Sequence, residues 1–269
     1  MVQELQKSKT LIYYYYGAQC YGYKYMACEA EKAAKVLNYQ YEKIDISIEN
    51  ALISTPLYFP GNIVVDDLVI TYPGSAKEIV QAIRNKGVIA GQLEYYQLKR
   101  ESAHYFKPLL GCLKACSKIC LKKQANDVSE KYNWIKEQAK YTNGKAGLVA
   151  FYNDKPVAAV EFVREDKVPY SIPNHRKQFL FITCLYNDYN TNKDFRDSLL
   201  TELKNVVIKD KLAGISVICG KDTPYPNGPV QILLDNGFVV NKKLDRVLLK
   251  NKWEQIFYMQ WFNKALYSI

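Results

Sequence analysis

The stretch from Phe179 to Leu200 has the residue types and spacing that an anion-binding site requires. Its first part, Phe179 to Leu185, carries no charge and is rich in β-branched and aromatic residues, which predicts a strand buried on both faces. Turn-forming residues at 187–192 follow, and leucines at 199, 200 and 203 then have helical spacing. Because the first-turn N–H groups of a helix have no partner within the helix, a strand that enters a helix through a tight loop can hold a phosphate there.

Three cysteines between residues 108 and 123 have the spacing of one helical face, since Cys112, Cys116 and Cys120 are at i, i+4 and i+8. The spacing matches neither a zinc C-x-x-C knuckle nor an iron–sulfur run. Cysteine buries readily as a small apolar residue, and leucines flank the same face. We therefore expect core cysteines and no metal site. His104 and His175 have no visible partner that would support one.

The elements around the strand at 179–185 resemble those of the GNAT superfamily of N-acetyltransferases. The resemblance covers residues 128–250. It implies a mixed α/β (α+β) chain in which residues 96–269 form a GNAT-like acyl-CoA N-acyltransferase fold. Three further segments carry it: two strands around an Asn153–Asp154 turn in 147–163, the next strand at 213–220, and a helix-to-strand segment at 231–240 with the family's Gly-Phe pair at Gly237 and Phe238.

The resemblance implies a cofactor site for acetyl-CoA. In the family, the loop after the strand grips the pyrophosphate with the pattern Q/R-x-x-G-x-G/A, and the glycine positions fall here on Asp194 and Arg196. Both glycines are missing, and a carboxylate at the helix start can cap the free N–H groups, so we expect acetyl-CoA to bind weakly or not at all in the usual way. The backbone at 185–187 would hold the pantetheine, and the loop at 190–196 the pyrophosphate. The cofactor-binding candidates are Leu185, Tyr186, Asn187, Asn190, Thr191, Asn192, Lys193, Asp194, Phe195 and Arg196.

Two residues are candidates for proton transfer. Glu161 lies on the strand next to the cofactor strand, where the resemblance implies a general base that deprotonates the acceptor amine. The alternative is that Glu161 is an outward strand residue that faces solvent. Leu233 stands where many family members have a tyrosine that acts as general acid, so the phenol of Tyr225, in a loop near the expected cleft, is the best remaining proton donor.

Residues 1–95 resemble thioredoxin-like domains. Cys20 follows the first strand, where that family has C-x-x-C, and Pro56 matches the family's cis-proline position. Tyr23 replaces the resolving cysteine, so catalytic disulfide exchange is not expected. Cys20 is then either a single reactive thiol or a relic in a domain used for binding or packing. The predicted elements are strands at 10–16, 41–48, 57–59 and 62–70 and helices at 27–37 and 75–84.

The composition is that of an ordinary globular protein, with 48% hydrophobic and 24% charged residues in 269. Seven cysteines and no signal peptide or membrane span predict free thiols and a cytoplasmic protein without membrane contact. The net charge of +10 belongs to the second half, because residues 1–95 carry 9 basic and 10 acidic side chains. No nucleic-acid module is recognisable, so nucleic acid is not an expected partner.

The C-terminal segment predicts an amphipathic helix over 253–266. Trp253, Phe257 and Trp261 repeat every four residues, and such an aromatic face needs cover. We expect this helical extension to pack on the first domain or on a second copy of the chain, as in a homodimer.

Three functions follow from these patterns. The first is an N-acetyltransferase that moves acetyl from acetyl-CoA to an amine of a small molecule or peptide. The second is a catalytically inactive binding protein on the same fold, which recognises a metabolite or a protein. The third, a thiol-redox protein that uses Cys20, has the least support.

Overall fold

The computed structural model describes residues 9–48, 57–71, 74–89, 98–120 and 128–266. The chain divides into two units: residues 1–93 with 248–253 form unit 1, and residues 94–247 with 254–269 form unit 2. Each unit has its own sheet and its own apolar core. Among the described residues, none of the helices combines the length and the apolar composition that a bilayer crossing requires.

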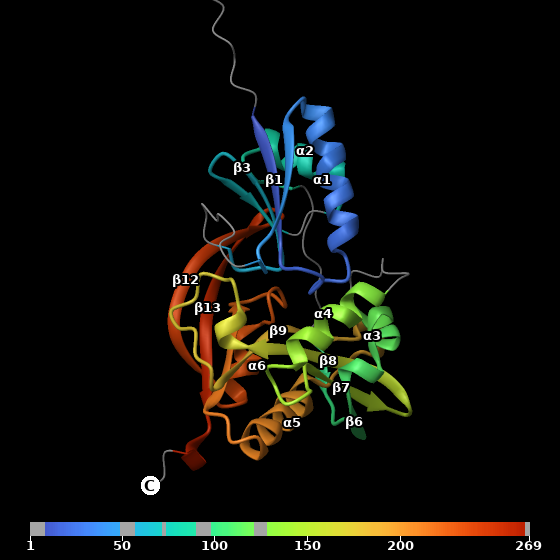
Figure 1. The fold of residues 1–269 in the computed structure, drawn as a ribbon, viewed down its shortest axis with the longest axis vertical. Helices are drawn as coiled ribbons and strands as arrows, with labels where there is room; N and C mark the ends of the chain where they lie inside the picture. The colour runs from blue at the N-terminus through green and yellow to red at the C-terminus, as the bar shows by residue number, and fades with distance from the viewer. Residues whose placement is uncertain (1–8, 49–56, 72–73, 90–97, 121–127, 267–269) are drawn as a thin grey trace, which may run out of the picture. The chain divides into compact units, whose positions relative to one another are not determined.

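In the described residues, unit 1 has a four-stranded sheet and two helices (Figure 1). Its elements are β1 (Thr10–Tyr15), α1 (Tyr23–Leu37), β2 (Gln40–Asp45), β3 (Gly61–Val65), β4 (Leu68–Ile70) and α2 (Ala76–Arg84). The strand order is β2-β1-β3-β4, with β1 parallel to β2 and antiparallel to β3. Three alanines on one face of α1 are buried against the sheet, which lets the helix approach the strands closely.

Strands β3 and β4 of unit 1 differ from the prediction. Residues 57–59 are not a strand, and the segment 62–70, expected as one strand, is the β3–β4 hairpin. Its turn lies at Asp66 and Asp67, where Asp66 has a φ of +53°. Two adjacent carboxylates could not both stay in a buried strand, and aspartate tolerates the left-handed conformation, so the turn forms there. The order of strands and helices otherwise agrees with the expected pattern, and the thioredoxin-like assignment stays a prediction.

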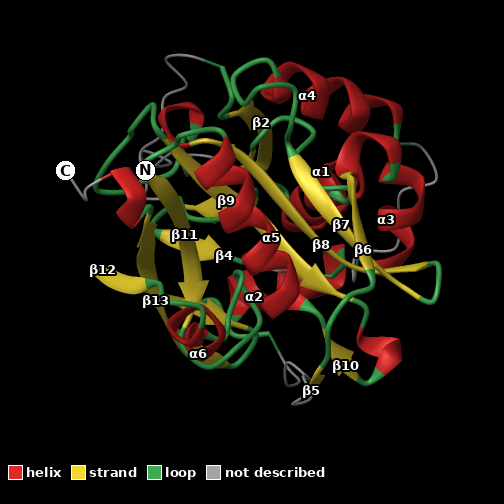
Figure 2. Cartoon of the chain, turned by 90° about the horizontal axis from the view of Figure 1, so that it is seen from below, coloured by secondary structure: helices red, strands yellow, loops and turns green. Residues whose placement is uncertain are grey.

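Unit 2 is built on a seven-stranded sheet of order β12-β13-β11-β9-β8-β7-β6 (Figure 2). Its strands are β6 (Tyr105–Pro108), β7 (Gly147–Tyr152), β8 (Lys155–Arg164), β9 (Phe179–Asn187), β11 (Gly214–Gly220), β12 (Val239–Leu249) and β13 (Lys252–Phe262). A separate two-stranded pair joins β5 (Lys99–Arg100) and β10 (Lys193–Asp194). The helices are α3 (Leu113–Ile119), α4 (Ser129–Ala139), α5 (Arg196–Lys209) and α6 (Val230–Asp235), with 3-10 turns η1 (Leu109–Gly111), η2 (Glu165–Lys167), η3 (Tyr189–Thr191) and η4 (Lys264–Leu266).

Helices α5 and α4 pack on opposite faces of this sheet. Leucines of α5 share a fully buried cluster with Val160 and Phe162 of β8. Between those two residues on the strand, Glu161 points the other way and reaches Lys131 of α4. The central strands, with a helix on each side, therefore position the residues around Glu161.

Most of the predicted elements of unit 2 are confirmed. The hairpin at 147–163 is β7–β8, and its turn residues Asn153 and Asp154 both have positive φ, +49° and +60°. The strands at 179–185 and 213–220 are β9 and β11, and the segment at 231–240 is α6 followed by the start of β12.

The predicted C-terminal helix over 253–266 is wrong. Residues 252–262 are strand β13, which pairs antiparallel with β11, and only a 3-10 turn follows. Spacing of four residues is also an even number, so Trp253, Phe257 and Trp261 share one face of a strand as they would of a helix. Intervening residues settle the matter, because Glu254, Ile256 and Tyr258 are buried on the other face at a period of two.

The segment that contains Cys112, Cys116 and Cys120 is only partly helical. α3 contains Cys116, which is fully buried, while Cys112 and Cys120 flank the helix and are half-buried. Among the described residues, no group of three or more potential metal-ligating side chains is placed to hold an ion.

Candidate functional site

The central feature of unit 2 is a fork between β9 and β11. The two strands pair in parallel from Phe179 and Gly214 as far as Ile182 and Val217. Beyond that point β9 continues to Asn187 and β11 to Gly220, and the two strands no longer pair with each other. Each keeps its other neighbour, β8 for β9 and β13 for β11. We call these ends, residues 183–187 and 218–220, the fork. The fork includes the backbone at 185–187 that the resemblance assigns to pantetheine.

The side chain of Asn227 lies in the fork. Its carbonyl oxygen Oδ1 accepts a hydrogen bond from the backbone N–H of Leu185 at 2.8 Å, and its Nδ2 donates to the carbonyl of Ile218 at 3.1 Å. Asn227 is buried, with 8% of its surface exposed. One amide thus joins β9 to β11 at the place where their own ladder has ended.

The segment that carries Asn227, residues 221–229, is anchored at several points. The N–H of Gly220 donates to the carbonyl of Pro226 at 2.8 Å, and the carboxylate of Glu254 accepts from the N–H groups of Asp222 and Thr223 at 2.7 and 2.8 Å. Gly228 is so closely packed that an added Cβ would lie 2.2 Å from the carbonyl oxygen of Thr223. We call residues 221–229 the fork segment.

The loop after β9 is held by Asn187. Its Oδ1 accepts from the N–H of Phe195 at 2.9 Å, and its Nδ2 donates to the carbonyl of Lys193 at 2.6 Å. Asn192 has a φ of +53°, the left-handed conformation in which glycine or asparagine is favoured. The loop candidates at 190–196 therefore form a tight turn that is closed by a side chain from the end of β9.

Asp194 and Arg196, which occupy the positions of the missing glycines, form a buried ion pair with 7% and 5% of their surfaces exposed. The guanidinium donates through Nε and Nη2 to both carboxylate oxygens at 2.9 and 2.7 Å. Asp194 Oδ1 also accepts from the backbone N–H of Arg196 at 3.0 Å, at the start of α5. The third donor, Nη1, reaches the carbonyl of Gly228 at 2.6 Å and so ties the loop to the fork segment.

A second chain segment lies along the same loop. β5 pairs with β10, which places Lys99 and Arg100 beside Lys193 and Asp194 (Figure 2). Arg100 forms ion pairs with Asp197 of α5, at 3.2 Å, and with Asp235 of α6.

Lys193, one of the two cations among the loop candidates, already has partners. Its ammonium lies 3.0 Å from Glu101 and donates to the hydroxyl of Tyr152 at 2.9 Å. The hydrogen bond to Tyr152 and the carboxylate of Glu101 both raise the pKa of Lys193. Since Arg196 is likewise engaged, both cations of the loop are directed at groups of the chain itself.

The hydrogen bonds within this site do not fit acetyl-CoA bound in the usual way, because they use donors that the cofactor would need. The Leu185 N–H is taken by Asn227, the Phe195 N–H by Asn187 and the Arg196 N–H by Asp194. Three of the donors that the resemblance assigns to the cofactor site are thus bonded to side chains of the same chain.

Glu161 is buried, with 2% of its surface exposed, so the solvent-facing reading of this residue is wrong. Its carboxylate is 2.6 Å from the ammonium of Lys131 of α4, itself 4% exposed, and accepts a longer contact of 3.4 Å from the hydroxyl of Tyr186. Cys116 of α3 lies nearby, and burial followed by the charge of Glu161 raises the pKa of its thiol. The cluster of Glu161, Lys131, Tyr186 and Cys116 is assembled from four elements.

Tyr225, the other candidate for proton transfer, is in the fork segment and half-buried. Burial raises the pKa of its phenol, with smaller contributions from Tyr189, Cys120 and Cys184, so the phenol is protonated at neutral pH.

Leu233, at the position where the resemblance implies a tyrosine, is fully buried in the apolar cluster beneath α5. A phenol at this place would need a hydrogen-bond partner.

The redox candidates of unit 1 are only partly described. Cys20 is half-buried in the turn between β1 and α1, and its carbonyl accepts from the N–H of Tyr23 at 3.3 Å. Tyr23 is the first residue of α1. Pro56 lies outside the described residues.

Sequence reasoning missed Asn227 and Lys131. Lys131 had a usable signal, because it is at i, i+4 and i+8 with Ile135 and Ala139, the buried face of α4. Asn227 had no such signal apart from its place between two prolines. Its neighbours in the sequence do not indicate that its side chain reaches Leu185, 42 residues away.

No family model matches the sequence, and no curated protein matches it. Solved structures similar to this chain include the ribosomal-protein-alanine N-acetyltransferase from Brucella melitensis, at 15% identity over 59% of this chain and 99% of that one, with a TM-score of 0.44. Others are an N-acetyltransferase from Staphylococcus aureus Mu50 (12%, 59% and 97%, TM-score 0.45) and a GNAT-family acetyltransferase from Streptococcus pneumoniae (14%, 59% and 98%, TM-score 0.43). The structural neighbours are thus GNAT acetyltransferases.

Proposed function

We propose that unit 2 is a GNAT-type fold that acts as a binding protein, in which the acetyl-CoA site is filled by the chain's own residues. The observation that carries this proposal is the Asn227 side chain, which satisfies the N–H of Leu185 and the carbonyl of Ile218 at once. A ligand at these two groups would have to displace a buried amide. An unsatisfied buried polar group costs about 1–3 kcal/mol, so displacement is unfavourable unless the ligand restores the lost hydrogen bonds.

The anchoring of the fork segment supports the same proposal. Arg196 bonds the carbonyl of Gly228 from one side, and Glu254 bonds the N–H groups of Asp222 and Thr223 from the other. Moving Asn227 out of the fork would disturb these buried, charge-assisted contacts as well. In this proposal the ligand, a metabolite or a protein, is recognised elsewhere on the chain.

The second candidate is an N-acetyltransferase that uses acetyl-CoA and an amine of a small molecule or peptide. One contact favours it: the carboxylate of Glu161 lies 2.6 Å from the ammonium nitrogen of Lys131, which is the distance at which a general base takes a proton from a protonated amine. An acceptor amine would then replace Lys131, and Tyr225 would serve as proton donor. Within the described residues, no contact of Cys20 favours a redox role.

Calorimetric titration of the full chain with acetyl-CoA separates the two candidates. The informative variant is Asn227→Gly, because Asn227 has a φ of +47°, which glycine adopts freely, so the side chain is removed without backbone strain. We expect no binding by the wild type at cofactor concentrations up to about 1 mM, a limit of about −4 kcal/mol. In the variant, binding should appear.

The matched control is Asn143→Gly, which removes an exposed asparagine from the same backbone conformation, with φ of +52°. This control should behave as the wild type. Micromolar binding by the wild type, with acetylation of an added primary amine, would refute the binding-protein proposal in favour of the enzyme.

A further inference from the structure

A shallow pocket lies in unit 2, lined by residues other than those of the fork. Its cavity volume is about 440 Å³, within the range of small-molecule sites. It is formed where β6, η1, α3 and β7 meet, and no residue of the fork or of the fork segment lines it. The residues that matter to its chemistry are Lys107, Gly111, Cys112, Lys114, Lys118 and Phe151.

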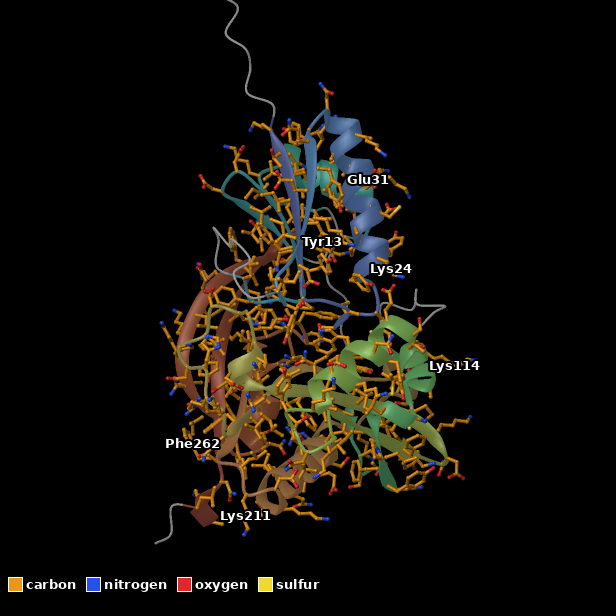
Figure 3. The ribbon with its side chains drawn as sticks, in the orientation of Figure 1. Tyr13, Lys24, Glu31, Lys114, Lys211 and Phe262 are labelled. Carbon is orange, nitrogen blue, oxygen red and sulfur yellow. The ribbon has the colours of Figure 1, made fainter. Side chains whose placement is uncertain are left out.

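The pocket is strongly basic. Three lysines line it and no acidic residue does. Within the described part of the chain, Lys107, Lys114 and Lys118 make no ion pair. Lys114, labelled in Figure 3, and Lys118 project from successive turns of α3, and like charges at this i, i+4 spacing repel each other. An anion between them would turn this repulsion into attraction.

Lys107 is held in place by aromatic rings. Its ammonium lies 5.3 Å from the ring centroid of Tyr105 and 5.0 Å from that of Phe151, and the two rings stack 5.0 Å apart. The carboxylate of Asp154 accepts a hydrogen bond from the Tyr105 hydroxyl at 3.0 Å and so is engaged at the far end of that ring. The side chain of Lys107 is therefore already ordered by these rings, so less conformational entropy is lost when a ligand binds.

The remaining lining adds no negative charge. Burial raises the pKa of the Cys112 thiol, and the nearby Lys107 only partly opposes this, so the thiol is neutral at physiological pH. At Gly111, the space where a Cβ would project is open. The site thus offers three ammonium groups, a neutral thiol and the edge of an aromatic pair. Ammonium groups do not bind cations, and exposed lysines disfavour an apolar ligand.

We propose that this pocket binds a small molecule through its phosphate groups. Lysine is a point charge with three donors, which suits a phosphate that presents several acceptor oxygens. Three such groups around one cavity match a diphosphate better than a single carboxylate. The phosphate can be free or carried as an ester, and the two sources are separated by the ligands tested.

The experiment is calorimetric titration of the full chain with pyrophosphate at low ionic strength, where charge–charge attraction is least screened. Phosphoserine, a phosphate monoester, and citrate, a tricarboxylate, serve as comparison ligands. The variant Lys114→Gln, Lys118→Gln removes two of the three cations from exposed positions, so its folding should be unaffected. We expect its dissociation constant for pyrophosphate to rise about tenfold or more, as loss of charge-assisted contacts predicts.

The control variant, Lys242→Gln with Lys243→Gln, removes the same charge from exposed positions on β12. Its affinity should stay within about twofold of the wild type, because the lost charges are not at the pocket. Equal weakening by both variants would assign the binding to the overall charge of the chain and overturn the proposal. Citrate binding as tight as that of pyrophosphate would overturn the assignment to phosphate.

Labelling of Cys112 locates the ligand independently. The thiol is half-buried in the pocket, so bound pyrophosphate should slow its alkylation by iodoacetamide, measured by peptide mass spectrometry. The exposed Cys28 of unit 1 is the internal control and should react at the same rate with and without ligand. Unchanged alkylation of Cys112 at saturating pyrophosphate would contradict a site in this pocket.

Discussion

Lys131 and Glu161 form an ion pair of 2.6 Å that is almost completely removed from solvent. The lysine comes from α4 and the glutamate from β8, so the pair fixes the helix to the central sheet. Two charges out of water are stable only together, because each one alone would carry an uncompensated desolvation cost.

The first prediction is that Lys131→Met destabilises the protein by about 3–5 kcal/mol, the cost of a buried charge without its partner. Urea unfolding measures this change. The double variant Lys131→Met, Glu161→Leu should recover most of the lost free energy. Lys140→Met, which breaks an exposed pair with Glu137, should cost about 0–1 kcal/mol. A loss that is the same in the single and double variants would show that packing, and not charge pairing, sets the cost.

A second prediction concerns Arg196, which joins Asp194 to the carbonyl of Gly228. Arg196→Met should destabilise the protein by about 3–5 kcal/mol, because Asp194 remains buried without its partner. It should also loosen the fork segment, which hydrogen exchange detects as faster exchange of the Gly220 and Gly228 amides. Arg100→Met, a change at a half-exposed ion pair, is the control. Exchange at the fork segment that is equal in both variants would argue against the anchoring role of Arg196.

The third prediction is that the free energy of unfolding falls at alkaline pH because Tyr258 loses its proton. Its hydroxyl donates to Glu165, and burial together with this contact raises the pKa of Tyr258 to about 12. The unfolded value is about 10, so the folded state holds the proton more tightly. Stability from this group is therefore complete below pH 10 and is lost as the pH rises from about 10 to 12.

The measurement is the difference in unfolding free energy between the wild type and Tyr258→Phe. This difference should shrink between about pH 10 and 12, the range that the raised pKa sets. The other tyrosines are present in both proteins and cancel. A constant difference across this range would contradict the role given to the Tyr258 proton.

The fourth prediction tests the C-terminal strand. A chain that ends at residue 251 lacks β13, which pairs with β11 over seven residues and supplies Glu254 to the fork segment. We expect aggregation or loss of cooperative unfolding, since β11 would become an open apolar edge. A chain that ends at residue 263 keeps all of β13 and should unfold as the full protein does. Equal thermal melting of both truncations would be inconsistent with a structural role for β13.

The sequence alone determined the parts of unit 2 whose signals are local. The apolar run of β9, the β7–β8 turn at Asn153 and Asp154, and β11 can all be read from a few neighbouring residues. The missing glycines at positions 194 and 196 were equally visible, and so was the expectation that Asp194 would take an N–H at the start of α5. These features depend on residue type and on position along a single element.

The tertiary structure decided what no local pattern could. The every-fourth-residue spacing of Trp253 and Phe257 fits a helix and a strand equally, and only pairing with β11 selects the strand. Likewise, the sequence places Glu161 on a strand, but the burial of its carboxylate depends on Lys131 from a separate helix. Asn227 meets Leu185 across 42 residues of chain, so the filling of the fork is a consequence of how distant segments pack and not of any motif.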